Sequence, residues 1–237
     1  MKQEQMQKLI SDLREDSLAE NIVINGNDKS LVNQYKLHDN IPNKWFDWVN
    51  RVDAQVMIIG QDWGPYSVLK KMIEDPTYTN DEERYWGTFS SRTEKFIMKA
   101  IQSTYEEEVG EFNRDVFDKF IFTMAVLFTR KGNHFRGVDN FHEKRSFEIS
   151  YPYVSRQIDI VKPKVIMPLG RMGVEILDKK FELGLFIDKT LTQIVEENLD
   201  KEPIRVGDYS IIPNFHPASH TDPKKQIRQW RKIWEIA

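Results

Sequence analysis

Short runs of consecutive apolar residues alternate along the chain with segments in which apolar residues recur at helical spacing. Four of the runs contain β-branched residues, and three of them are flanked by glycine or proline, a pattern typical of buried parallel strands. These runs are Gln55–Ile59, Phe120–Phe128, Val165–Leu169 and Tyr209–Ile212. Val206-Gly207-Asp208 predicts a tight turn, so we expect Pro203–Val206 to pair with the last run as an edge strand.

Helical periodicity fills most of the chain between and around these strands. The first helix places Met6, Leu9, Ile10 and Leu13 on one face. We expect the rest of residues 1–50 to form helices and loops. The other helical segments are Arg92–Ile101, Phe147–Val161, Gly173–Leu177 and Ile227–Ile236. This alternation predicts an α/β protein, a three-layer α/β/α sandwich around a mainly parallel four-stranded sheet.

The carboxyl ends of parallel strands are where ligands bind in such folds. The loops that begin at Gly60, Thr129, Gly170 and Pro213 are therefore the candidate site loops. A chain of 237 residues is long enough for one good core. We expect a single domain over residues 1–237, with residues 1–50 as a helical extension packed on it.

Composition narrows the class of protein. No apolar stretch approaches the roughly 20 residues of a membrane span, and the polar N-terminus does not resemble a signal peptide. The chain has no cysteine, which excludes disulfides, thiolate-bound iron–sulfur clusters and cysteine nucleophiles. We expect a cytoplasmic monomer that has no contact with a membrane.

The formal net charge is -3, so any DNA-binding surface must be a local basic patch. One basic segment spans Arg130–Arg145, and the other runs from Lys224 to Lys232 near the C-terminus. For charge runs alone, a solvated helix face or loop is the favoured interpretation.

Two of the candidate loops carry polar residues suited to catalysis. The loop after the first strand reads GQDWGPY from Gly60 to Tyr66, and the loop after the last strand reads PNFHPASH from Pro213 to His220. Taken singly, Asp62 could cap the following helix and His216 could be a structural hydrogen-bonding group. Two such loops at one edge of a sheet favour a catalytic pair.

These motifs resemble those of the uracil-DNA glycosylase superfamily. GQDWG at Gly60–Gly64 is similar to the first motif, which reads G-Q-D-P-Y in one branch and G-E-A-P-G in the family-four branch. Arg156–Leu177 is similar to the helix–KP–strand–LG–helix unit of the family-four branch, and HPAS at His216–Ser219 is similar to the second motif. The order and spacing of these motifs agree with those of the superfamily from about Gln55 to the C-terminus.

The resemblance implies a DNA glycosylase of base excision repair that hydrolyses the N-glycosidic bond of uracil or a related damaged base, with no metal or cofactor. It implies that Asp62 stabilises the sugar cation, that Gln61 helps to hold the water, and that His216 stabilises the leaving base. Phe89 would stack on the extruded base. The remaining base- or DNA-binding candidates are Gly60, Trp63, Gly64, Tyr66, Thr123, Met124, Pro217, Ala218 and Ser219.

The chain departs from the family pattern at the base-reading position. Met124, beside Thr123, stands where the superfamily usually has an asparagine that reads the uracil edge, and methionine cannot make the paired contacts of an amide. The family-four branch also carries cluster cysteines that this chain lacks. Three interpretations therefore stay open: a glycosylase acting on DNA, a hydrolase of another base or nucleoside, and a non-catalytic nucleic-acid-binding protein with the same fold.

Overall fold

A mixed sheet forms the centre of the protein. The computed structural model describes residues 1–16, 23–24, 27–28, 31–33, 47–61, 92–130, 140–217, 219 and 221–237. The sheet has five strands in the order β5-β4-β7-β9-β8. They are β4 (Val56–Gly60), β5 (Phe120–Met124), β7 (Val165–Pro168), β8 (Ile204–Val206) and β9 (Tyr209–Ile211). All neighbours pair in parallel except β8 and β9, which are antiparallel. The prediction of an α/β fold with a mainly parallel sheet is confirmed.

The fifth strand, β8, pairs with β9 across the turn that the sequence predicts near Gly207. Ile204 pairs with Ile211 and Val206 pairs with Tyr209, which makes β8–β9 a hairpin. Gly207 has φ +56, a left-handed conformation that glycine adopts without steric cost. The four predicted parallel strands therefore gain an antiparallel edge strand.

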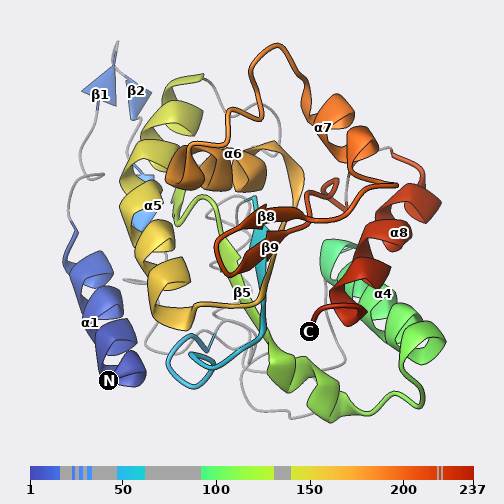
Figure 1. The fold of residues 1–237 in the computed structure, drawn as a ribbon. Coiled ribbons are helices and arrows are strands. Elements are labelled where there is room, and N and C mark those ends of the chain that lie inside the picture. The colour runs from blue at the N-terminus through green and yellow to red at the C-terminus, as the bar shows by residue number, and fades with distance from the viewer. Residues whose placement is uncertain are drawn as a thin grey trace.

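Helices cover both faces of the sheet, as Figure 1 shows. On one side lie α5 (Asn140–Val161) and α6 (Gly170–Phe181), with α1 (Lys2–Glu15) packed against α5. On the other side lie α4 (Arg92–Glu108) and α8 (Pro223–Trp234), which contact each other. Two shorter helical elements complete the described part, η3 (Arg114–Lys119) and α7 (Leu191–Glu197). Among the described residues, no helix is long and apolar enough to cross a membrane.

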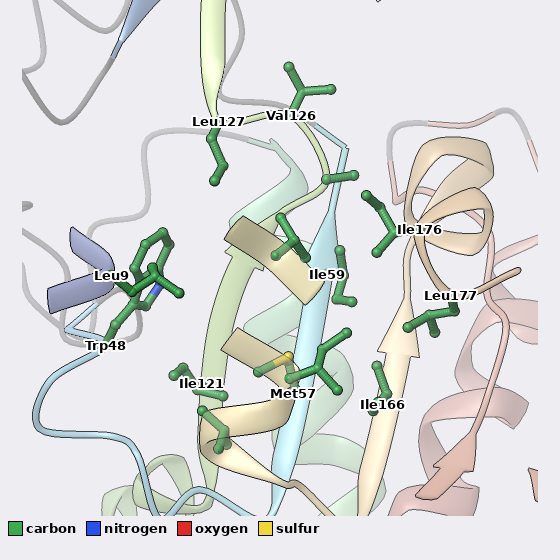
Figure 2. Packing of buried hydrophobic residues seen from close by; sticks show 14 of the residues in the cluster. Leu9, Trp48, Met57, Ile59, Ile121, Val126, Leu127, Ile166, Ile176 and Leu177 are labelled. Atoms are coloured by element: carbon green, nitrogen blue, oxygen red, sulfur yellow. The ribbon is translucent and has the colours of Figure 1, made fainter. Parts of the chain in front are cut away.

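Two apolar cores, one on each face, hold these layers together. Met57 and Ile59 of β4 enter the core beneath α5 and α6, whereas Val56 and Ile58 enter the core beneath α4 and α8. This alternation is the two-residue period of a strand that is buried on both faces. Figure 2 shows the first core, in which Ile176 and Leu177 of α6 approach Ile166 of β7.

The N-terminal segment contributes to the first core. Met6, Leu9 and Leu13 are completely buried, which confirms the predicted apolar face of α1. Trp48 is also buried, and its indole Nε1 donates to the carbonyl of Phe122 at 2.8 Å. This hydrogen bond ties the chain just before β4 to the neighbouring strand.

The structure differs from the sequence-based expectation in three places. Phe120–Phe128 is not one strand: β5 ends at Met124, and β6 (Phe128–Arg130) pairs antiparallel with β3 (Leu31–Asn33). The predicted loop at Thr129 is therefore wrong, because the chain leaves β5 at Ala125. The described part of residues 1–50 contains strands as well as helix α1, since β1 (Val23–Ile24) also pairs with β2 (Asn27–Asp28). Helix α7 was not expected; the side chains of Thr190 and Gln193 cap its first turn reciprocally.

Candidate active site

The carboxyl ends of β4 and β5 are joined by hydrogen bonds between the loops that follow them. Gly60 aligns with Met124 in the parallel register. The backbone N–H of Ala125 donates to the carbonyl of Gly60 at 2.8 Å, and that of Val126 donates to the carbonyl of Gln61 at 3.0 Å. These bonds hold Gln61 at the mouth of the sheet, where its side chain is partly exposed.

The Met124 side chain lies directly over Gly60. A Cβ atom built on Gly60 would stand only 2.5 Å from the Met124 Sδ, a distance that real Cβ atoms essentially never show. A side chain at position 60 would therefore displace the flexible end of the Met124 side chain. The pair forms an apolar surface that remains partly exposed beside Gln61.

Thr123 points to the opposite face of the sheet from Met124, as strand alternation requires. Its side chain is 1% exposed, and its hydroxyl donates to the Gln157 Oε1 of α5 at 2.7 Å. This hydrogen bond gives Thr123 a structural role between sheet and helix. Of the two residues predicted at the base-reading position, only Met124 is open to solvent.

The loop after β9 is anchored through Asn214. Asn214 is fully buried, and its Nδ2 donates to the carbonyl of Gln226 in α8 at 3.2 Å, while its Oδ1 accepts from the N–H of Phe215 at 2.8 Å. The backbone of Asn214 also forms an isolated parallel β-bridge with Leu169. Since Phe215 and Pro217 are buried on either side, the backbone of His216 is fixed while its side chain stays partly exposed.

The end of the motif bends back on itself. The N–H of Ser219 donates to the carbonyl of His216 at 2.8 Å, and the Ser219 hydroxyl donates to that of Thr221 at 3.1 Å. The side chain of Asp222 then caps α8 by accepting from the N–H of Lys224 at 2.9 Å. The HPAS loop is thus held between the sheet and the first turn of α8.

Gly170 is the point at which the two candidate loops meet. A Cβ atom built on Gly170 would lie 3.1 Å from the His216 Cβ and 3.6 Å from the Gln61 Oε1. The structure therefore brings Gln61 and His216, one from each candidate loop, close together at the carboxyl edge of the sheet. The sequence predicted a candidate site loop beginning at Gly170, which is wrong because α6 begins at this residue, and it assigned Gly170 itself no role in the site.

Several predicted site residues lie outside the residues that the structure describes. They are Asp62, Trp63, Gly64, Tyr66, Phe89 and Ala218. Among the described residues, no group of three or more His, Cys, Asp or Glu side chains could hold a metal ion.

The basic C-terminal segment is largely neutralised by acidic neighbours. Lys225 pairs with Glu196 at 2.5 Å, Arg228 pairs with Asp200, and Arg231 contacts Glu107 at 2.6 Å. Lys232 donates to backbone carbonyls of the segment after α7, and burial lowers its pKa from the ordinary value. This face of α8 is therefore an ion-paired helix surface. It agrees with the interpretation of the basic run from Lys224 to Lys232 as a helix face rather than a DNA-binding patch.

The described geometry defines an α/β protein in which the loops after β4 and β9 bring Gln61 and His216 close together at the carboxyl edge of the sheet. The sequence model of the Uracil DNA glycosylase superfamily matches residues 46–237. This match covers most of the chain, and the chain belongs to that superfamily, which confirms the resemblance seen in its motifs. The search of curated proteins found no match. Membership supports a DNA glycosylase type of function, with DNA as the partner.

Proposed function

We propose that the protein is a DNA glycosylase that hydrolyses the N-glycosidic bond of uracil or a related damaged base in DNA, as a step of base excision repair. The observation that carries the proposal is the meeting of Gln61 and His216 at Gly170, in a chain of this superfamily. In the proposed site, these two loops, which are far apart in sequence, would form the two walls.

The proposed chemistry divides between these walls. Breaking the bond between base and deoxyribose creates an oxocarbenium-like sugar and an anionic leaving base. Asp62, which directly follows Gln61, would stabilise the cation and orient the attacking water with the help of the Gln61 amide. His216 would donate a hydrogen bond to the base carbonyl as negative charge develops there. Phe89 would receive the extruded base by stacking.

The remaining site residues are proposed to shape the pocket. Gly60 and Met124 would form one wall of the base pocket, and Pro217, Ala218 and Ser219 would hold the His216 loop against DNA. Trp63, Gly64 and Tyr66 would line the same opening from the loop after β4. A cytoplasmic monomer remains our prediction for the working form, as does one domain over residues 1–237 with residues 1–50 packed on it.

The Met124 side chain over Gly60 favours a second candidate. A thioether cannot supply the paired donor and acceptor that read the edge of uracil. The protein would then be a hydrolase of another base, with the same catalytic groups and a different specificity.

Labelled single-stranded and duplex oligonucleotides carrying uracil, hypoxanthine or xanthine test both candidates, with alkaline cleavage reporting each abasic site. Asp62→Ala is expected to abolish base release. His216→Ala is expected to lower kcat by about 10²–10³-fold, the usual cost of removing one donor to a developing anion. Asp208→Ala is the matched control, because Asp208 is an exposed carboxylate in the β8–β9 turn.

The pattern of released bases separates the candidates. Release of uracil in preference to the other bases supports the first, and release of hypoxanthine or xanthine alone supports the second. Inactivity on every substrate with intact DNA binding would contradict both and would favour a non-catalytic nucleic-acid-binding protein.

A further inference from the structure

Gly170 occupies a position that no other residue type could fill without moving its neighbours. Its φ is +79, in the left-handed region that favours glycine. A Cβ atom there would stand 3.1 Å from the Cβ of His216, 3.8 Å from the His216 backbone N and 3.6 Å from the Gln61 Oε1. The first distance is tighter than nine in ten real Cβ contacts, so a side chain at position 170 would push His216 by a few tenths of an ångström.

The backbone of Gly170 cannot retreat from this contact, because it is held on both sides. Its N–H donates to the carbonyl of Asn214 at 2.9 Å, and the N–H of Leu169 donates to the carbonyl of Ile59 at 2.8 Å. The N–H of Asn214 in turn donates to the carbonyl of Pro168 at 3.0 Å. One turn further along α6, Gly173 packs so closely that a Cβ atom would lie 2.9 Å from the carbonyl oxygen of Ile59.

We propose that Gly170 is a positioning residue that sets the distance between His216 and Gln61. The inference rests on the proposed function, in which His216 stabilises the leaving base and Gln61 helps to hold the water. Both groups must reach one substrate from opposite walls. Because Gly170 has no side chain, the His216 backbone can lie close against the β7–α6 junction. This close packing keeps the side chains of His216 and Gln61 at a fixed separation.

Gly170→Ala is the direct test. A misplacement of about 1 Å can cost on the order of 10²-fold in rate, so a shift of a few tenths of an ångström is expected to lower kcat by about 10-fold. KM is expected to change less, because the DNA contacts outside this point are intact. Gly170→Asn is the second variant, since asparagine tolerates a positive φ while still adding a Cβ atom.

Gly207 is the matched control. Gly207→Ala introduces the same kind of backbone strain at φ +56, but a Cβ atom there meets nothing within 4 Å, so kcat should stay within about 2-fold of wild type.

A double-mutant cycle separates positioning from general damage. If Gly170 acts through His216, Gly170→Ala should cost little further activity in the His216→Ala background. An equal loss in both backgrounds would overturn the proposal.

A spectroscopic measurement keeps the test independent of catalysis. The chain has five histidines, and His216→Ala assigns the ring signals of His216 in a proton–carbon correlation spectrum. Gly170→Ala or Gly170→Asn should shift these signals, and Gly207→Ala should not. Unshifted signals in folded variants would overturn the positioning role. Absence of base release by the wild type would overturn only the proposed function, because the spectra still report the position of the ring.

Discussion

Met124 ends β5 with its sulfur above Gly60, and it packs against both cores while remaining partly exposed. The neighbouring Thr123 is turned away and engaged with Gln157. At the level of single residues, the described wall of the proposed base pocket is therefore apolar. We infer that this wall makes contact with a base through shape and dispersion rather than through paired hydrogen bonds.

Met124→Asn should increase discrimination in favour of uracil. An amide that pairs with both a donor and an acceptor on a base is worth about 1–3 kcal/mol of discrimination, or roughly 5- to 150-fold in relative kcat/KM. The measurement is kcat/KM for uracil against hypoxanthine in otherwise identical oligonucleotides. Met124→Leu is the control, and it should keep the wild-type ratio because it preserves an apolar side chain of similar volume. Equal ratios for the two variants would count against a base-facing Met124.

At the level of elements, α1 is joined to the rest of the fold by both apolar and polar contacts. Leu9 and its buried neighbours on α1 share a core with Ile158 of α5 and Trp48. Around this core, Arg156 pairs with Asp12 at 2.9 Å and the Tyr153 hydroxyl donates to Asp16 at 2.7 Å. These contacts support the proposal that the N-terminal segment is part of a single folding unit.

Leu9→Ala should lower the free energy of unfolding by about 2–5 kcal/mol, the usual cost of a cavity at a fully buried leucine. Urea denaturation monitored by tryptophan fluorescence gives the value. Gln7→Ala lies on the exposed face of the same helix and should change stability by less than about 0.5 kcal/mol. If Leu9→Ala were no more destabilising than Gln7→Ala, α1 would not be docked in solution.

At the level of the whole molecule, two tyrosines link stability to alkaline pH. Burial, followed by the hydrogen bond to Asp16, raises the pKa of Tyr153 above its ordinary value. Burial likewise raises the pKa of Tyr209, with help from the negative charges of Asp159 and Asp208. Both phenols keep their protons more tightly in the folded state than in the unfolded chain.

The protein should therefore lose stability as the pH rises above about 10, the ordinary pKa of tyrosine. Below that pH both states are protonated and the stabilisation is fully present; above it the unfolded chain ionises first, so unfolding becomes easier. Unfolding free energies measured from pH 8 to about pH 11 give the slope. Tyr153→Phe should show a shallower decline, and an unchanged slope would mean that Tyr153 does not carry the effect.

The sequence alone determined the class of fold and the order of its main elements. Continuous apolar runs such as Val165–Leu169 can be buried only within a covered sheet, and helical periodicity identifies the segments that cover it. The motifs at Gly60 and His216 likewise identified the family, because both are local features of the chain.

The tertiary structure decided which of these segments meet. The strand pattern placed Gly170 at the carboxyl edge of the sheet, but its contacts with Gln61 and His216 depend on residues that follow strands far apart in the chain. The pairing of β3 with β6 and the ion pairs along α8 also depend on contacts between residues that are far apart in sequence. Periodicity shows which face of an element is buried, whereas the packing of distant elements determines which side chains share a site.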